Sequence, residues 1–514
     1  MGERVTAAAG LLVHLDRDSP VPLQQQLCDQ VTGLVREGRL RPGDGVPATR
    51  ELARQLSVSR TVVLRAYELL RARGVLTARR GSGTVVAGQA PAADPPPVSR
   101  APLAPRPPRP TDDGHPLWQP WEPPPMHHRG GALDFRHGTP ALAAFPVARW
   151  RQSLAAAYAR ADATALGYGH AEGAPALRAE IAALVRQSRA LDAPPDRIVV
   201  TTGATQAMDI LVRLLVRPGD VVVIEDPSHT VLRQVFGFSE AAVVPVPVDE
   251  QGLRVEDIDA CVRARGHDPG RVRLVYVTPS HQFPTGCVMS EARRSALVDW
   301  AHRRGATVLE DDYHNEFTFS GERLPALASG RHRDVVAYVG SFSKTLFPAL
   351  RIGYAVLPPH LVHPFLGIKW ITDRLTPTIG QEALADFIAS GAYTRHISRM
   401  TRLYRQRRRR LLEALYEHFG AGVRVSGEAA GLHVLVTLTG ARRAPEPEIA
   451  RRAAAHGVRV YPASGYYVQD PPREPAFLMG YAALPVARIT EGVALLAAAV
   501  RETERSPGPN RRRP

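Results

Sequence analysis

The sequence contains very little lysine. Of its 65 lysine and arginine residues only two are lysine, Lys344 and Lys369, and all the others are arginine. An arginine guanidinium stays protonated and cannot form a Schiff base, whereas a desolvated lysine amine can. If the protein carries out carbonyl–amine chemistry, one of these lysines takes part. Lys344 is the better candidate because it follows an apolar strand pattern and lies between hydroxyl residues; the alternative is a surface lysine in a loop.

Cysteine and long apolar runs are also scarce. The three cysteines, Cys28, Cys261 and Cys287, are far apart and odd in number, which argues against a disulfide framework or a metal site. The sequence has no apolar run long enough to span a bilayer, and its N-terminus shows no signal-peptide pattern. We therefore expect a cytoplasmic protein that binds neither a metal nor a membrane.

Charge of one sign is in excess. The formal net charge is +15, which favours a polyanionic partner such as nucleic acid. An arginine-rich composition gives part of the same signal, so charge alone does not decide. The length of 514 residues predicts two to four domains.

The first 88 residues have the pattern of a winged helix-turn-helix. An amphipathic run, two further helical segments and a glycine-tipped pair of short strands follow one another, at residues 23–35, 50–56, 60–70, 75–78 and 84–87. Thr49 can cap the second helix. A recognition helix needs short polar and arginine side chains at its N-terminal end, and Ser59, Arg60 and Thr61 supply them.

This segment resembles the GntR family of bacterial repressors. The likeness rests on three stretches in the same order, residues 40–53, 58–67 and 81–84, the first containing Arg41-Pro42-Gly43-Asp44. It implies that the domain binds a double-stranded DNA operator. The residues it implies in DNA contact are Arg50, Ser59, Arg60 and Thr61, with a wing formed by Gly81, Ser82 and Gly83 entering the minor groove. The alternative is an arginine-rich helical face exposed to solvent.

Residues 89–130 are rich in proline and predict a semi-rigid spacer. Trp118 and Trp121 within it form either a docking patch or loosely exposed aromatics. From Leu133 onward helices and strands alternate, which predicts an α/β domain with a mainly parallel sheet.

Polar residues follow several of these predicted strands, where ligands of open α/β sheets bind. A pyridoxal 5′-phosphate site needs a lysine, an acid for the pyridinium nitrogen, donors for the phosphate and groups that fix the ring. Lys344 and Asp311 supply the first two, and Tyr313 can donate to the ring oxygen. The candidate phosphate ligands are Gly203, Ala204, Thr205, Ser341, Ser343 and Arg351.

The second half of the chain resembles fold type I aminotransferases over about residues 131–500. Ser341-Phe342-Ser343-Lys344 with Arg351 further on, Asp311 and Tyr313 before it, and the stretch 168–178 match in order. Together with the GntR-like segment, the whole chain resembles the MocR-type regulators. The expected organisation is a DNA-binding domain at 1–88, a linker at 89–130, a cofactor-binding domain at 131–505 and a basic tail at 506–514.

The resemblance implies roles for two more residues. Tyr168 should reach the phosphate of a neighbouring subunit, which implies a homodimer, and His281 should lie near the ring oxygen. His229 occupies the position of the aromatic residue that covers the cofactor ring. Leu478 and Met479 stand where aminotransferases have an arginine for the substrate carboxylate. Arg136, Arg233 or Arg488 could replace that arginine.

Three functions are therefore open. The first is a transcription factor that senses pyridoxal phosphate through an internal aldimine at Lys344 and controls vitamin B6 metabolism. The second is a regulator whose cofactor captures an amine or amino acid, and the third is an aminotransferase with an accessory DNA-binding domain. The missing arginine favours a regulator with at most residual transaminase activity.

Residues 395–410 carry eight arginines. They form either a helix face exposed to solvent or a second contact with DNA phosphates.

Overall fold

The computed structural model describes residues 13, 15–17, 19–79, 83–88, 133–162, 166–313, 316–319, 324–441 and 445–505. The chain divides into two compact units, Met1–Met126 and His127–Pro514. The wing residues Gly81 and Ser82, the proline-rich segment with its two tryptophans, and the basic tail lie outside the described residues. Over the described ranges, no helix is long and apolar enough to cross a membrane.

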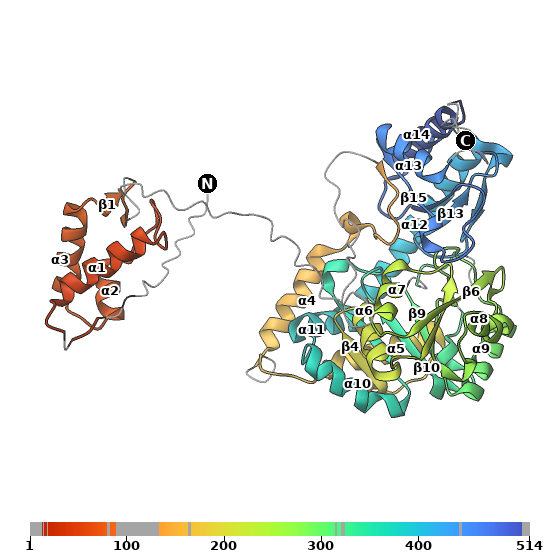
Figure 1. Ribbon diagram of the computed structural model, residues 1–514, viewed down its shortest axis with the longest axis horizontal. Coiled ribbons are helices and arrows are strands. Elements are labelled where there is room, and N and C mark those ends of the chain that lie inside the picture. The colour runs from red at the N-terminus through yellow and green to blue at the C-terminus, as the bar shows by residue number, and fades with distance from the viewer. Residues whose placement is uncertain are drawn as a thin grey trace. The chain divides into compact units, whose positions relative to one another are not determined.

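The first unit is a winged helix-turn-helix, as the sequence predicts (Figure 1). Its elements are α1 (Leu23–Arg36), α2 (Thr49–Gln55), α3 (Arg60–Ala72), β1 (Leu76–Arg79) and β2 (Gly83–Val86). Leu27, Val31, Val63 and Leu70 are completely buried at the centre of its core. The helices thus bury their apolar faces against one another, and the antiparallel pair β1–β2 closes one end of the core through Leu76 and Val86.

Helices α2 and α3 of this unit begin differently. Ser59 caps α3, its Oγ accepting a hydrogen bond from the Val62 N–H at 3.4 Å. The prediction that Thr49 caps α2 is wrong, because Thr49 is the first helical residue and Ala48 precedes it without a side-chain cap. Helix ends predicted from a sequence pattern are commonly displaced by one or two residues, as here.

The second unit is built around an eight-stranded sheet with the order β4-β11-β10-β9-β8-β5-β6-β7. The strands are β4 (Ile198–Thr201), β5 (Val221–Asp226), β6 (Ala242–Asp249), β7 (Gly252–Leu253), β8 (Val272–Val277), β9 (Thr307–Asp312), β10 (Val336–Ser341) and β11 (Gly353–Val356). Only β7 and β11 run antiparallel to their neighbours. The other six strands therefore end at the same edge of the sheet.

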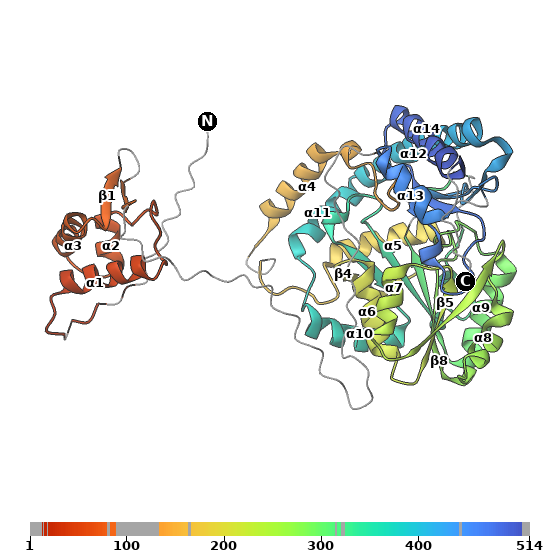
Figure 2. The ribbon, with the colours of Figure 1, turned by 45° about the horizontal axis from the view of Figure 1, so that its top comes forward.

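Helices cover both faces of this sheet. They are α4 (Val147–Arg160), α5 (Pro175–Arg189), α6 (Ala204–Leu215), α7 (Thr230–Gly237), α8 (Ile258–Ala264), α9 (Glu291–Arg304), α10 (Pro359–Thr372) and α11 (Thr378–Ala389). Along β5 the side chains alternate between two hydrophobic clusters, with Val221 and Val223 in one and Val222 and Ile224 in the other. The second cluster is completed by α6, α7 and α10, which lie side by side with α6 in the middle (Figure 2).

The C-terminal part forms a smaller lobe. Its four-stranded sheet has the order β12-β13-β16-β15, from β12 (Arg424–Ser426), β13 (His433–Thr437), β15 (Tyr461–Pro462) and β16 (Ala476–Gly480). The helices are α12 (Ala392–Phe419), α13 (Glu446–Ala455) and α14 (Val486–Arg505). A short parallel pair joins β3 (Leu133–Asp134) to β14 (Val458–Arg459), so the start of this unit is fixed to the small lobe.

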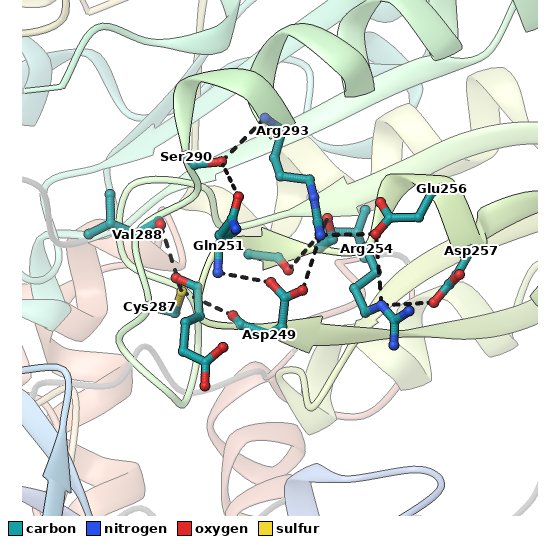
Figure 3. A network of polar contacts seen from close by, with 12 residues as sticks. Asp249, Gln251, Arg254, Glu256, Asp257, Cys287, Val288, Ser290 and Arg293 are labelled. Atoms are coloured by element: carbon teal, nitrogen blue, oxygen red, sulfur yellow. Dashed lines mark hydrogen bonds and ion pairs between the residues drawn. The ribbon is translucent and has the colours of Figure 1, made fainter.

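A network of polar contacts fixes the loop between β8 and α9 (Figure 3). Arg293, in the first turn of α9, donates to Asp249 Oδ2 at 3.0 Å and to Glu256 Oε1 at 2.9 Å. The Ser290 N–H donates to the Gln251 carbonyl at 3.0 Å. These bonds fix the end of the loop. The beginning of the same loop carries Thr278, His281 and Phe283, which belong to the site described below.

Candidate cofactor-binding site and DNA-binding surface

The candidate site lies where the parallel strands end. Asp311 is near the end of β9, Lys344 follows β10, and Gly203 follows β4. Since these strands share a direction, their polar residues meet at one edge of the sheet. The charges of Asp311 and Arg351 both act on the pKa of Lys344, which places the three side chains in one site.

The Lys344 amine has the character of a nucleophile. Its Nζ donates a hydrogen bond to the Gly138 carbonyl at 2.9 Å. Burial lowers the pKa of the amine and Arg351 lowers it further, while Asp311 acts in the opposite direction. A Cβ at Gly138 would lie 3.0 Å from Nζ, so the glycine permits this close approach. A lowered pKa raises the fraction of neutral amine that can attack a carbonyl.

Asp311 is a buried acid at a strand end. Its Oδ2 accepts a hydrogen bond from the Tyr276 hydroxyl at 2.9 Å. Burial raises the pKa of Asp311 to about 7, against the effects of Tyr276 and Lys344. A cation placed beside such a carboxyl would favour its ionised form, which is the relationship a protonated pyridine nitrogen needs.

An anion cradle is formed by the turn before α6. Gly203 has φ +126°, and a Cβ there would lie 2.9 Å from Arg351 Nη2. The glycine therefore leaves open a space beside the guanidinium, next to the backbone N–H groups at the start of α6. Ala204 and the exposed Thr205 form the first turn of that helix. Ser341 is the last residue of β10, and its Oγ accepts a hydrogen bond from the Ser343 N–H at 3.2 Å.

Tyr313, His229 and His281 surround the same edge. The Tyr313 hydroxyl donates to the backbone carbonyl of His281 at 2.9 Å. The His229 ring lies 4.9 Å from the ring of Phe283, and burial lowers the pKa of His229 to about 4. The His281 ring lies 5.3 Å from His433 and close to Gly431, on the small-lobe side of the loop. Both imidazoles are therefore neutral near pH 7, since burial also lowers the pKa of His281 to about 4.

Several residues of the site were not singled out from the sequence. Phe283 lies within the motif that carries His281, and its ring contacts His229, Tyr313 and Tyr466. His137 lies 2.9 Å from the Tyr466 hydroxyl through Nε2, and burial lowers its pKa to about 3. The buried ring of His433 completes the cluster.

The sequence held different signals for these residues. Phe283 could have been found from its motif, because it precedes Pro284-Thr285-Gly286. His137, Tyr466 and His433 lie near no recognisable motif and come from three separate segments. Only the folding of the small lobe against the sheet brings them together.

Glu225, at the end of β5, is a further buried acid near the site. Its Oε2 accepts hydrogen bonds from Thr278 Oγ1 at 2.6 Å and from the Thr278 N–H at 3.1 Å. Burial raises the pKa of Glu225 to about 7. Its charge acts on the pKa of Tyr313, and the charge of Asp311 raises the pKa of Glu225, so these groups influence one another's ionisation.

The three arginines considered for an effector carboxylate differ in position. Arg233 donates to the Gly465 carbonyl at 2.7 Å, and Arg488 lies on α14 in an ion pair with Glu491 at 2.7 Å. Arg136 donates to the Tyr461 hydroxyl at 3.3 Å and its charge lowers the pKa of His137 in addition to burial. Leu478 and Met479 are completely buried in β16. Of the three, Arg136 acts through its charge on His137 and Arg233 acts on His229, whereas Arg488 acts on neither histidine.

Two other residues considered from the sequence are Tyr168, the predicted contact to a neighbouring subunit, and Lys369, the alternative to Lys344. Tyr168 is 77% exposed, with the Arg374 guanidinium 5.6 Å from its ring centroid. Within this chain it is thus a surface residue, and its contact with a neighbouring subunit stays a prediction. Lys369 is completely buried and forms an ion pair with Asp373 at 2.8 Å, so it is not available for carbonyl chemistry.

The predicted DNA contacts are on the surface of the first unit. Arg50 is in the first turn of α2, and Ser59, Arg60 and Thr61 are at the start of α3; all four are exposed. Gly83 begins β2 with φ +82°, while the other two wing residues are not described. The N-terminal end of α3 therefore presents the side chains that the helix-turn-helix geometry places toward base edges.

The two units match two protein families. Residues 133–494 match the family described as aminotransferase class I and II, and residues 23–86 match the bacterial regulatory proteins of the gntR family. The second match covers α1 through β2. The first covers the sheet, the strand-end site and most of the small lobe.

Similar proteins match this chain across both units. The chain is 34% identical to the "Probable rhizopine catabolism regulatory protein MocR" of Rhizobium meliloti, over 96% of this chain and 97% of that one. It is 31% identical to the "HTH-type pyridoxine biosynthesis transcriptional regulator PdxR" of Corynebacterium glutamicum, over 89% of this chain and 92% of that one.

Solved structures resemble the second unit. The kynurenine aminotransferase of Pyrococcus horikoshii, in complex with PMP, has a TM-score of 0.67 and 28% identity over 74% of this chain and 93% of that one. The α-aminoadipate aminotransferase LysN of Thermus thermophilus, complexed with N-(5′-phosphopyridoxyl)-L-leucine, has a TM-score of 0.65 and 28% identity over 73% and 93%.

The cofactor of this fold is pyridoxal 5′-phosphate, and the residues at this edge of the sheet fit it. A desolvated amine, a buried acid and an anion cradle occur together at the strand ends, as this cofactor requires. With a DNA-binding winged helix before that domain, the chain belongs to the MocR-type regulators, in which a GntR-family helix-turn-helix is joined to an aminotransferase class I and II domain.

Proposed function

We propose that this protein is a transcriptional regulator that responds to pyridoxal phosphate bound at Lys344 and controls genes of vitamin B6 metabolism. The winged helix would bind an operator in the cytoplasm, and occupancy of the cofactor site would change its affinity. The proposed domains are those predicted from the sequence: a DNA-binding domain at 1–88, a linker at 89–130, a cofactor-binding domain at 131–505 and a tail at 506–514. The proposed assembly is a homodimer in which Tyr168 reaches the neighbouring subunit.

The observation that carries this proposal is that a buried lysine, Lys344, and a buried acid, Asp311, lie at the same edge of the sheet and influence each other's pKa. The cofactor supplies an aldehyde and an electron-withdrawing ring when it is bound. Lys344 would hold the aldehyde carbon, Asp311 the ring nitrogen, and Gly203, Ala204 and Arg351 the phosphate. Ser341, Ser343 and Thr205 are the further candidates for phosphate contacts. His229, whose ring lies beside Phe283, would cover the cofactor ring, and Tyr313 would fix the ring oxygen.

Vitamin B6 as the regulated pathway is supported by two independent points. Apolar Leu478 and Met479 occupy the position of an arginine that would hold an amino-acid carboxylate, so the site is better suited to the cofactor alone. In addition, a relative of similar length carries the name of a pyridoxine biosynthesis regulator.

A second candidate function is a regulator that captures an amine or amino acid on its cofactor. Arg136 favours it, because its guanidinium adjoins His137 at the edge of the aromatic cluster and could hold a carboxylate. An active aminotransferase would need the same arginine in addition to Lys344 as a proton-transferring base.

The test is DNA binding by the full-length protein as a function of pyridoxal phosphate. The probe is the intergenic duplex upstream of its own gene, used with the parent protein and with Lys344→Ala and Lys344→Arg. Arginine keeps the positive charge but has no nucleophilic amine. The proposal expects the cofactor to change the affinity of the parent and of neither variant.

Other outcomes separate the alternatives. If the parent binds DNA equally well with and without cofactor, the pyridoxal phosphate response is refuted. A response that appears only after amines or amino acids are added to the loaded protein supports the second candidate. Turnover of an amino acid and a keto acid, without binding of any DNA probe, supports the enzyme.

A further inference from the structure

Helix α12 carries eight arginines, and the structure divides them into two sets. Three of them, Arg407, Arg408 and Arg410, are partly buried and contact the small lobe. Arg407 donates to the Ala482 carbonyl, Arg408 donates to the Glu428 carbonyl, and Arg410 donates to Thr490 Oγ1 at 2.7 Å. These three arginines join the helix to its surroundings and are accounted for by the fold.

The other five arginines are exposed, and we call them the outer arginine stripe: Arg395, Arg399, Arg402, Arg405 and Arg409. Their spacing of three or four residues places them along one side of the helix. The helix itself lies where the small lobe meets the large sheet (Figure 1), and its opposite side is buried through residues such as Ile397, Met400 and Tyr404.

The charge of this stripe is largely uncompensated. Arg402 and Arg405 have neither an ion pair nor a hydrogen bond with any described residue. Arg395 donates to the Ser390 carbonyl at 3.1 Å and Arg399 to the Ala144 carbonyl, contacts that orient the guanidinium without neutralising it. Arg409 alone has a carboxylate partner among the described residues, Glu413 at 3.5 Å.

A helix face that is merely exposed to solvent usually has a different pattern. Opposite charges spaced by three or four residues stabilise an exposed helix, and like charges destabilise it by about 0.2–0.5 kcal/mol per pair. The last turns of α12 follow the stabilising pattern, with Arg410 paired to Glu413 and Glu417. The outer arginine stripe does not follow this pattern between Arg395 and Arg405. Acidic residues three or four positions from these arginines would have been compatible with a helix.

Helix α4, which follows the segment that Arg399 contacts, does not supply the missing negative charge. Its sequence contains three arginines and no acidic residue. Arg149 is directed to Asp386 at 3.0 Å, and Arg160 lies 4.0 Å from the same carboxylate. That acid is thus already shared by two arginines of α4, and the stripe stays free to attract an external anion.

We propose that the outer arginine stripe binds phosphates of duplex DNA outside the segment read by the winged helix. This inference rests on the proposed DNA binding by the first unit. From Arg395 to Arg409 the helix rises about 21 Å, a length over which duplex DNA carries about twelve phosphates. Guanidinium groups bind phosphate oxygens in a bidentate manner, and a row of them matches a repeating polyanion without reading sequence.

The experiment compares two DNA probes with three full-length proteins. The long probe is the upstream intergenic duplex, and the short probe is the same duplex cut to the footprint that the winged helix protects from nuclease. The proteins are the parent, the double variant Arg402→Ala/Arg405→Ala, and a matched control, Arg263→Ala/Arg265→Ala. The control removes the same charge from exposed arginines at α8, which lies well away from α12 in both views (Figures 1 and 2).

The stripe variant is expected to bind the long probe more weakly, with a slope of log affinity against log salt smaller by about 2. Its binding to the short probe should equal that of the parent, and the control should match the parent on both. Equal long-probe affinity and salt slope in all three proteins would overturn the inference. Equal weakening of both probes would also overturn it, because the effect would then not lie in the flanking DNA.

The proposed function fails in a different way. If the parent protein does not bind the long or the short probe, the first unit is not a DNA-binding module for this duplex, and the stripe inference falls with it. If the parent binds both probes but the stripe variant is unchanged, only the stripe inference is lost.

Discussion

The Nζ atom of Lys369 lies 2.8 Å from Oδ1 and 3.0 Å from Oδ2 of Asp373, in an ion pair whose lysine is completely buried. Asp373 Oδ2 also accepts from Gln206 Nε2 at 2.7 Å, and Gln206 Oε1 accepts from the Thr202 N–H at 2.8 Å. Thr202 and Gln206 flank the Gly203 turn. The second lysine of the chain therefore braces the anion cradle beside the first.

Lys369→Met should destabilise the protein by roughly 3 kcal/mol, because Asp373 is left without its cation in a largely buried position. It should also weaken pyridoxal phosphate binding, since Gln206 loses its fixed partner. The measurements are denaturant unfolding and a cofactor titration followed by absorbance.

The matched control is the double variant Lys369→Met/Asp373→Leu. With both charges removed, much of the lost stability should return. Cofactor affinity should stay low, because leucine at position 373 leaves Gln206 without its acceptor. Full cofactor affinity in the double variant would show that the brace has no effect on the cradle.

The buried acids make the stability of the cofactor-free protein depend on pH. Burial raises the pKa of Glu225, Glu310 and Asp311 each to about 7. The folded state then binds more protons than the unfolded state between about pH 4 and pH 7. Stability from these groups is present below pH 4 and is lost as the pH rises to 7, by up to about 1.4 kcal/mol per pH unit for each group.

Glu225→Gln isolates one of these contributions. An amide oxygen can still accept from Thr278, but the amide does not titrate. The unfolding free energy of the variant should therefore fall less between pH 5 and pH 7.5 than that of the parent, by the contribution of one carboxyl group. Parent and variant are compared by denaturant unfolding at several pH values. Identical slopes would mean that Glu225 is already ionised in the folded protein at pH 5.

The order of elements could be predicted from the sequence because each follows from local periodicity. The helices of the first unit and the alternation from Leu133 are patterns of this kind, and Lys344, Asp311 and Gly203 are predictable because each lies at or shortly after the end of an apolar strand. Phosphate and ring contacts predicted for these residues stay predictions until a cofactor is bound.

Other features of the site depend on packing between distant segments. The Gly138 carbonyl meets Lys344 only because β3 pairs with β14 and places the segment that follows β3 over the sheet edge. His137 and Tyr466 are 329 residues apart in sequence. The pairing of Lys369 with Asp373 is local, at positions i and i+4, yet its connection to the Gly203 turn through Gln206 is not visible in any motif.

Gly203→Ala should reduce cofactor affinity by about tenfold or more. A Cβ there would lie 2.9 Å from Arg351 Nη2, and φ +126° is a conformation that alanine adopts only with strain of about 1–3 kcal/mol. The control is Gly367→Ala on α10, where a Cβ meets nothing within 4 Å. That change should stabilise the helix by up to about 1 kcal/mol and leave cofactor binding unchanged. Equal cofactor affinity in both variants would refute the assignment of this turn as the phosphate cradle.

Arg60→Ala should weaken binding to the operator and relax its sequence preference. Arg60 is the first residue of α3 and is exposed, at the end of the helix that enters the major groove in this class of protein. The loss of one base contact costs about 1–3 kcal/mol of discrimination. The control is Arg73→Ala at the opposite end of the same helix, where the guanidinium lies 3.7 Å from Asp29. Competition with unrelated duplex DNA measures the preference; if Arg60→Ala and Arg73→Ala lower specific binding equally, the loss reflects general charge and not recognition by the start of α3.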